Sequence, residues 1–348
     1  MAYTTIDDPT IFFNTKLYTG NGGNQTITGV GFKPDWTWWK SRDAGNSHAL
    51  VDIVRGTNGV LYSGSTSTEQ PISAQTFNSD GYALVQDAGA NSINSNGSTK
   101  VAWSWLAGGS QGSSNTDGSI NTTYTSANTT SGFSISTYTG TGSNATVGHG
   151  LGAVPKVVLV KGIGHTSQWY MYHAGAGANK VGLLDNTAVF STDTTSWQNT
   201  TPTSSVFSIG NDGGTNGGSN TYIAYCFAEK KGFSKFGSYV GNGEPIGDAP
   251  FIYTGFKPAF LLIKSSTYAE SWAMTDNRRL GYNGSSAFLK ADDPQAEATD
   301  LVNPNLLSNG FSLQNNDNVY NKNTQSYIYW AFAESPFVTS TGIPSSAG

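Results

Sequence analysis

The 348-residue chain has little of what many enzymes and membrane proteins carry. It contains a single cysteine, Cys226, which excludes a disulfide within the chain. Charged residues make up 12% of the chain, and the net charge of −5 comes without a basic cluster. This composition argues against nucleic acid or an anionic membrane as a partner, because both are bound through basic side chains. No apolar run reaches the roughly 18 residues that a membrane-spanning helix needs, so we expect no membrane insertion.

Metal-binding and nucleophile motifs are also missing. The four histidines are scattered, and neither His-Glu-x-x-His nor Cys-x-x-Cys occurs, so we expect no zinc, iron or other cofactor. The string closest to a nucleophile elbow, residues 61–65, lacks both flanking glycines of that motif. Two Asn- and Asp-rich loops, 211–214 and 315–318, offer oxygen ligands for calcium but do not have EF-hand spacing. Turn formation explains these loops better than a metal site does.

Paired carboxylates are the remaining route to catalysis, because a glycosidase needs two at a fixed separation. The available pairs are Asp43 with Asp52 and Asp292 with Asp293. Neither pair recurs along the chain with both members kept. We therefore interpret these acids as turn or loop residues and expect the protein not to be an enzyme.

What the chain does have is turn-forming and strand-forming residues in quantity. It contains 43 glycines and many Asn, Thr and Ser, and aromatic residues reach 12%. Such a mixture can bury a core and favours an all-β protein. Cys226 lies in the apolar segment 222–227, where we interpret it as a small buried hydrophobe.

One stretch occurs three times, at residues 31–40, 152–161 and 255–264. In each copy a proline is followed six positions later by a lysine, with strand-forming residues between. Proline is tolerated at the first residue of a strand, and apolar side chains on both parities predict a strand that is covered on both faces. We expect the three lysines, Lys40, Lys161 and Lys264, to be solvated where the strands leave the core, since lysine is rarely buried.

Further matches follow each copy. Eight residues beyond the lysine lie His48, Trp169 and Trp272, and twelve beyond it lie Asp52, His173 and Asp276. Arginine stands three residues after each of these aspartates, as Arg55 and Arg279, and we predict two ion pairs that each pin a loop. Three segments with alternating aromatic and small residues close the copies, at 101–105, 223–227 and 328–332, and predict strands with all large rings on one face.

These matches predict three tandem, jelly-roll-like β-sandwich repeats of about 100 residues, arranged in a row. We expect Trp36, Trp38, Trp103 and Trp105 to be structural core residues. Trp197 has polar neighbours, and it is the tryptophan that we expect to be exposed for glycan contact. The predicted segments are an N-terminal arm at 1–10, repeats at 11–106, 132–230 and 231–335, a flexible or exposed Gly/Ser/Thr/Asn-rich linker at 107–131 and a C-terminal tail at 336–348.

The motifs resemble a tandem β domain of tailed-phage virion proteins, found mostly in marine phages. The resemblance rests on residues 18–22, 31–43, 51–56, 79–82 and 101–105, is looser in the second and third copies, and covers most of residues 11–334. It implies a tail fibre or spike, or a head-decoration protein, without an assigned active site.

From this resemblance we expect a non-enzymatic virion component that mediates particle assembly or host attachment. Its implied partners are other virion proteins, further copies of itself and a host-surface glycan or protein. The N-terminus lacks the features of a signal peptide, which agrees with synthesis in the host cytoplasm. A carbohydrate-binding or carbohydrate-cleaving module that acts on bacterial surface glycans is the alternative.

Overall fold

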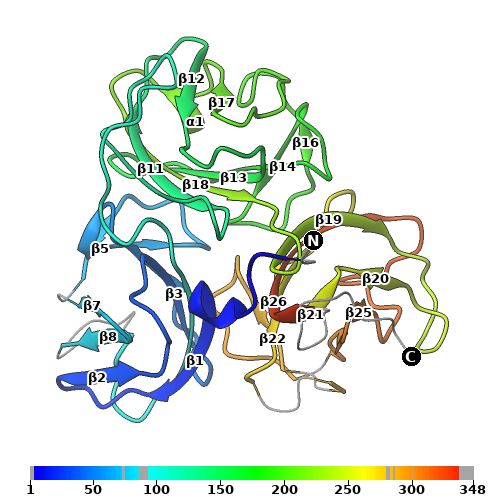
Figure 1. Ribbon diagram of the computed structural model, residues 1–348. Helices are drawn as coiled ribbons and strands as arrows, with labels where there is room; N and C mark the ends of the chain where they lie inside the picture. Colours follow the sequence, from blue (N-terminus) through cyan, green and yellow to red (C-terminus); the bar gives the residue numbers. More distant parts are fainter. Residues whose placement is uncertain are drawn as a thin grey trace.

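The computed structural model describes residues 4–72, 75–85, 93–279, 283–284, 287–299 and 301–336. Throughout this part of the chain the structure consists of antiparallel β-sheets, with one short 3-10 helix, η1 (Pro9–Ile11), and one short α-helix, α1 (Gly213–Asn216). The all-β prediction is therefore correct. Three lobes surround a common centre, and we call them the first, second and third units in chain order (Figure 1).

The first unit has a large sheet in the order β1-β9-β3-β4-β5-β6 and a small sheet in the order β2-β8-β7. Its strands are β1 (Phe13–Thr19), β2 (Gln25–Thr28), β3 (Trp36–Ser41), β4 (Ala49–Asp52), β5 (Gly56–Tyr62), β6 (Gln70–Pro71), β7 (Thr76–Asn78), β8 (Gly81–Leu84) and β9 (Thr99–Trp105).

The second unit has a large sheet in the order β10-β11-β18-β13-β14-β15-β16 and a small sheet of β12 and β17. Its strands are β10 (Tyr124–Asn128), β11 (Phe133–Thr139), β12 (Ala145–Gly148), β13 (Pro155–Gly162), β14 (Trp169–His173), β15 (Lys180–Leu183), β16 (Ser191–Thr192), β17 (Val206–Ile209) and β18 (Thr221–Ala228).

The third unit has a large sheet in the order β19-β26-β21-β22-β23 and a small sheet in the order β20-β25-β24. Its strands are β19 (Ser234–Val240), β20 (Phe251–Tyr253), β21 (Phe256–Ser265), β22 (Ala273–Asp276), β23 (Leu289–Lys290), β24 (Asn305–Leu307), β25 (Gly310–Ser312) and β26 (Ser326–Pro336).

The same strand order recurs in the three large sheets. The opening strand pairs with the closing strand, and the closing strand pairs with the strand of the Pro-to-Lys stretch, in β1-β9-β3, β11-β18-β13 and β19-β26-β21. The next two strands of the chain extend each sheet, as β4-β5, β14-β15 and β22-β23. The predicted Pro-to-Lys strands and closing strands are therefore present, and they lie beside each other at the middle of each sheet.

Each large sheet has two apolar faces with different partners. One face covers the small sheet of its own unit, where a separate apolar cluster fills the sandwich. The opposite faces of all three large sheets meet in one central cluster, to which Trp36, Tyr225 and Phe332 contribute from different units. Most large rings of the predicted closing segments face this central cluster, as their alternation with small residues predicts, but Tyr329 lies on the opposite face, in the sandwich of the third unit.

The central cluster corrects the expected arrangement in a row. Trp36 of the first unit stacks on Tyr225 of the second with ring centroids 4.7 Å apart. Phe227 of the second unit lies 5.1 Å from Trp330 of the third, and Trp105 of the first lies 5.6 Å from Phe332 of the third. Every unit thus packs against both others, and the three close into a ring. Sequence comparison within one chain finds the strands but carries no information on which buried face meets which.

The predicted linker at 107–131 is not a flexible spacer. It contains β10, which pairs with β11, and Ile120, which forms a parallel bridge with Val147 of β12. The segment is part of the second unit, and its Gly, Ser and Asn residues form turns that allow it to follow the surface of that unit.

The described end of the predicted N-terminal arm also packs against the body. Ile6 is 2% exposed within the central cluster, and Thr4 lies against Gly232, where an added Cβ would come within 2.9 Å of the Thr4 side chain. The predicted C-terminal tail lies outside the described residues except for Pro336, the last residue of β26.

Candidate functional site

The expected core tryptophans, Trp36, Trp38, Trp103 and Trp105, lie on β3 and β9 and are at most 1% exposed. They face the central cluster, and the closest pair, Trp36 and Trp105, has ring centroids 4.5 Å apart. Aromatic pairs at this separation add to the stabilisation from burial alone. These four residues therefore hold the ring together.

The expected ion pair of Asp52 with Arg55 is present at the junction of the first and second units. Arg55 Nε lies 2.6 Å from Asp52 Oδ2, and the backbone N–H groups of Val54 and Arg55 donate to Oδ1 at 3.0 and 2.8 Å. Tyr225 of the second unit donates its hydroxyl to Asp52 Oδ2 at 2.8 Å. Burial and the Asp52 charge raise the pKa of Tyr225 well above 10, so the phenol keeps its proton. The pair pins its loop, as predicted, and also bonds to the neighbouring unit.

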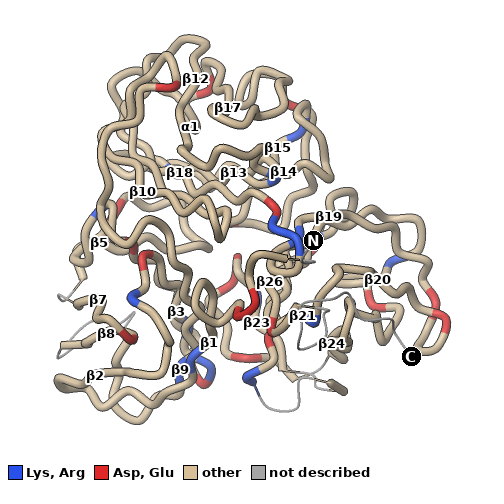
Figure 2. The backbone as a smooth tube through the Cα atoms, in the orientation of Figure 1, with Lys and Arg blue, Asp and Glu red and all other residues tan. Residues whose placement is uncertain are grey.

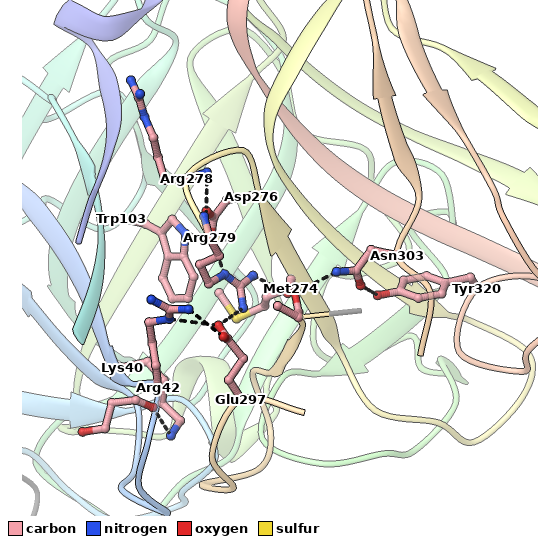
Figure 3. A network of polar contacts seen from close by, with 12 residues as sticks. Lys40, Arg42, Trp103, Met274, Asp276, Arg278, Arg279, Glu297, Asn303 and Tyr320 are labelled. Carbon is pink, nitrogen blue, oxygen red and sulfur yellow. Dashed lines mark hydrogen bonds and ion pairs between the residues drawn. The ribbon is translucent and has the colours of Figure 1, made fainter. Parts of the chain in front are cut away.

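The pair of Asp276 with Arg279 forms the corresponding junction between the third unit and the first (Figure 3). Arg279 Nε lies 2.7 Å from Asp276 Oδ2, which also accepts a hydrogen bond of 3.0 Å from the indole N–H of Trp103. Glu297 forms two ion pairs: its carboxylate lies 3.2 Å from Arg279 Nη1 and 2.8 Å from Nη2 of Arg42, which belongs to the first unit. Buried charges are tolerated here because each has several partners.

His173 takes the equivalent place between the second and third units. Its Nδ1 accepts from the Gly175 N–H at 3.0 Å, so Nε2 carries the proton and donates to the Tyr329 carbonyl at 3.4 Å. Burial lowers the pKa of His173 to about 4, which keeps the ring neutral. This junction therefore uses a neutral group where the other two use an aspartate.

The three strand-end lysines are buried, which contradicts their expected exposure: Lys40 is 1% exposed and Lys161 and Lys264 are 0% exposed. Each Nζ donates to a backbone carbonyl of the neighbouring unit: Lys40 to Pro294 at 3.0 Å, Lys161 to Thr66 at 3.0 Å and Lys264 to Thr187 at 3.1 Å. Burial lowers the pKa of each lysine to about 8. The expectation was wrong because the acceptors that permit burial lie in other units, remote in sequence.

The residues eight positions beyond the lysines also lie at junctions. The indole N–H of Trp169 donates to the Tyr62 carbonyl of the first unit, and that of Trp272 donates to the Leu183 carbonyl of the second, both at 2.9 Å. His48 accepts instead from Trp38 of its own strand pair, at 2.8 Å. In the second and third copies, the register match found in the sequence thus marks contacts between units.

The other candidate acids have structural partners. Asp43 accepts from the Ser98 hydroxyl at 2.6 Å and the Thr99 N–H at 2.8 Å. Asp292 accepts from the Trp272 N–H at 2.8 Å, and Asp293 accepts from the Gln295 N–H at 2.9 Å. None of these contacts is specific to catalysis.

Asp35 was not singled out from the sequence, yet its environment is unusual. It is completely buried at the start of β3, and its Oδ2 accepts from the Gly109 N–H at 2.7 Å. Burial outweighs this hydrogen bond and raises the pKa of Asp35 to about 6. Only its burial distinguishes it, and an aspartate beside a proline at the start of a strand is ordinarily a turn residue.

The sequence interpretations of the loops and of Cys226 agree with local contacts. Asp212 caps α1 by accepting from the Gly214 N–H at 2.7 Å, and Asp317 accepts from the Val319 N–H at 2.8 Å. Within the described ranges, no three His, Cys, Asp or Glu residues lie close enough to hold a metal ion. Cys226 is fully buried, and burial raises the pKa of its thiol far above its usual range.

Trp197 is not available for glycan contact. It is 1% exposed and packs in the sandwich of the second unit, 6.3 Å from the Tyr172 ring. Its polar neighbours in sequence form turns at the surface, while the indole points inward. The expectation of an exposed ring was wrong for that reason.

A family model described as a domain of unknown function (DUF7483) matches residues 8–336. The chain belongs to the DUF7483 family. The match spans all three units, so the DUF7483 domain corresponds to the whole ring and not to one lobe. No curated protein is significantly similar to the chain.

The DUF7483 domain has a surface cleft where the first unit meets the second. The cleft has a volume of about 280 Å³ and carries no charged side chain on its walls, which are formed by Thr66, Thr166, Ser167, Gln168, Tyr170, Gly213 and Gly214. The Tyr170 ring lies so close to Gly214 that an added Cβ would come within 2.0 Å of it. Burial, with a smaller effect of Asp212, raises the pKa of Tyr170 to about 12. Hydroxyl, amide and aromatic groups in this combination suit a neutral polar ligand.

Charge on the DUF7483 domain is sparse, and acidic and basic residues are dispersed over the three lobes (Figure 2). A second cleft of about 330 Å³ lies between β1 and the third unit and is lined by Lys16 and Arg278 among polar neighbours. In the part of the chain that the structure describes, no helix is long and apolar enough to cross a membrane.

Proposed function

We propose that the protein is a non-enzymatic structural component of a tailed-phage virion, made of three tandem β repeats. It serves as a tail fibre or spike, or as a head-decoration protein, in particle assembly or attachment to the host surface. The proposal rests first on the sequence resemblance described above. The observation that carries it further is the use of buried polar groups at the junctions between units.

Those junctions favour a structural role over a catalytic one. Asp52 and Asp276, the acids that recur in the sequence, are both 1% exposed or less and each accepts a hydrogen bond from the next unit. A catalytic carboxylate must reach a substrate, whereas these two bond only to the protein around them. A ring whose units are joined by buried hydrogen bonds suits a particle surface, where the protein must stay folded without cellular chaperones.

Gold-tagged antibody against the folded protein, applied to intact particles and viewed by electron microscopy, tests the proposal. Particles lacking the gene product serve as the control. Gold at the tail tip supports a role in attachment, and gold over the head supports decoration. Particles without gold, produced by a host in which the protein is made, would refute the virion assignment.

The second candidate function, a carbohydrate-binding module, is favoured by the uncharged cleft beside Tyr170. Aromatic rings with neighbouring hydroxyl and amide groups are suited to neutral sugars. A glycan array should show binding by the native chain that Tyr170→Ala abolishes. Tyr124→Ala is the matched control, because Tyr124 is a 37% exposed aromatic residue on β10 of the same unit, outside the cleft. Equal binding by both variants would remove the cleft from consideration.

Cleavage of a carbohydrate has less support than binding. Of Asp43, Asp52 and Asp276, the last two are buried in ion pairs, which leaves Asp43 as the exposed carboxylate of the three. Loss of polymer viscosity on incubation with the protein, abolished by Asp43→Asn, would establish cleavage. Unchanged viscosity would restrict this candidate function to binding.

A further inference from the structure

The small sheet of the third unit presents an exposed apolar edge. Its strand β20 stands at the end of the order β20-β25-β24, so one side of the strand has no partner strand in the described part of the chain. Phe251 is 48% exposed, Tyr253 is 52% exposed, and Ile252 between them is buried. Exposed, flat, apolar edge strands are binding templates that most proteins avoid.

Hydrogen bonds on the paired side fix which backbone groups face outward. The Thr254 N–H donates to the Asn309 carbonyl at 3.0 Å, and the Leu313 N–H donates to the Pro250 carbonyl at 3.0 Å. In an antiparallel pair, alternate residues bond to the partner strand, so the backbone N–H and C=O of Phe251 and Tyr253 point away from β25. The free edge therefore combines two outward-facing peptide groups with two aromatic side chains.

The aromatic side chains form one surface with the neighbouring strands. Gly310 of the middle strand β25 pairs with Tyr253 of β20 on one side and with Leu307 of β24 on the other. Leu307 is 36% exposed. The Phe251 ring covers Gly310, where an added Cβ would lie 2.8 Å from the ring. Phe251, Tyr253 and Leu307, which we call the β20 patch, are thus adjacent.

The second unit shows what covers the equivalent edge. Strand β12 pairs with β17 as β20 pairs with β25, with Val147 opposite Phe207 and Ile252 opposite Phe311. Residues 118–120 of the same chain lie along the outer edge of β12. The Ile120 N–H donates to the Thr146 carbonyl at 3.0 Å, and the Ser119 hydroxyl accepts from the Thr146 N–H at 2.9 Å. A short segment of the same chain, joined to β12 by these two hydrogen bonds and a single parallel bridge at its aliphatic residue Ile120, therefore occupies the edge in the second unit.

By this register, Phe251 is equivalent to Thr146 and Tyr253 is equivalent to Gly148. In the first unit the equivalent outward residues of β2 are Thr26 and Thr28, which are exposed and polar. Only in the third unit do aromatic residues stand at these positions. The polar edge of β2 discourages a partner strand, whereas the β20 patch has the surface to hold one.

We propose that β20 is a docking site for an extended peptide segment of a partner protein. The segment adds as a strand along the free edge, with apolar side chains on the β20 patch, as residues 118–120 lie along β12. Its backbone bonds to Phe251 and Tyr253, and an alternating apolar pattern provides selectivity. This inference does not depend on the virion assignment.

The test uses the full chain as bait for a displayed library of random dodecapeptides. The native chain should enrich peptides with alternating apolar residues. The double variant Phe251→Thr/Tyr253→Thr should bind the enriched peptides about tenfold more weakly or worse, because both anchoring rings are lost. This variant is expected to fold, since threonine stands at both equivalent positions of β2. The double variant Thr26→Ala/Thr28→Ala is the matched control and should bind as the native chain does.

Amide hydrogen exchange of the native chain with a synthetic copy of an enriched peptide supplies the second measurement. Strand addition should slow exchange at the Phe251 and Tyr253 amides, whereas a ligand on the side chains alone would leave them unchanged. Failure to enrich peptides, equal binding by the two double variants, or unchanged exchange at both amides would overturn the proposal. Dimerisation of the native chain abolished by Phe251→Thr/Tyr253→Thr would identify a second copy as the occupant and would also overturn it.

Discussion

The second unit should not fold by itself, although it contains a complete sandwich. A fragment of residues 107–230 retains its small sheet and the apolar cluster inside its own sandwich. It loses the first and third units, which cover the other face of its large sheet in the central cluster. Six large side chains of this face would be uncovered: Phe133, Trp169, Met171, Phe190, Tyr225 and Phe227.

The magnitude follows from the burial of these side chains. Burying one large apolar side chain contributes about 1.5–3 kcal/mol, so six contribute about 9–18 kcal/mol. The unit itself still covers part of each ring, and we take half of that sum, about 5–9 kcal/mol, as the loss. A whole domain is stable by only about 5–15 kcal/mol, so the fragment should lose its fixed tertiary structure.

Thermal unfolding by circular dichroism and a two-dimensional NMR spectrum of the fragment check this expectation. The control is the full chain carrying a protease site in the exposed stretch 109–111 and cleaved there, which should stay associated and melt cooperatively. A sharp, dispersed spectrum and a cooperative melt from the isolated fragment would refute the argument, since they would show that the central face is dispensable.

Three further predictions concern buried polar groups. Tyr225→Phe should lower the free energy of unfolding by about 1.5–3 kcal/mol in urea denaturation, because its hydroxyl bonds to a charged acceptor. Tyr138→Phe, which loses a bond to the neutral Thr215 carbonyl, should cost about 0.5–1.5 kcal/mol, and equal losses would contradict the assigned role of Asp52. Asp35 has a folded pKa of about 6 against about 3.9 unfolded, so its ionised form destabilises the fold above pH 6 and the effect vanishes below pH 4. Asp35→Asn should therefore gain up to about 3 kcal/mol over the native chain at pH 8 and nothing at pH 3.5, and a gain independent of pH would be inconsistent with this reasoning. Lys161 has a folded pKa of about 8, below its unfolded value, so it contributes stability that grows as pH rises from 7.5 to 9.5, by about 2 kcal/mol. Lys161→Met should lack that part of the rise, and parallel pH profiles for the two proteins would count against a buried, depressed lysine.

The sequence predicted the strands well because strand signals are local. The apolar run to the lysine and the alternation in 101–105 both describe a backbone and its two faces, whereas proline marks the first residue of the strand only in β13. Trp36 and Trp38 lie on one face of β3 and Trp39 lies on the other, as the apolar side chains on both parities of this stretch predict.

Hydrogen-bond partners that lie in different units could not be predicted from local sequence. Lys40 and Pro294, joined by a hydrogen bond, are 254 residues apart in the chain, and nothing near Lys40 indicates an acceptor. The prediction that Trp197 is exposed was wrong because it relied on the polar neighbours of Trp197 in sequence. The ring packs in a cluster formed by strands that are remote in sequence. Burial of a polar or isolated aromatic residue is a property of the assembled fold.

Closure of the ring has a consequence for association between molecules. Through its strand-end lysine each unit donates a hydrogen bond to one neighbour and accepts one from the lysine of the other, which is a head-to-tail interface. Interfaces of this type grow into open filaments unless the rotation returns to its start. Here the contacts of Asp276 and Glu297 with the first unit complete the circuit within one polypeptide. A chain truncated before β19 would lack the third unit and would expose the surfaces of the first and second units that normally contact it. We expect such molecules to associate head to tail into polymers.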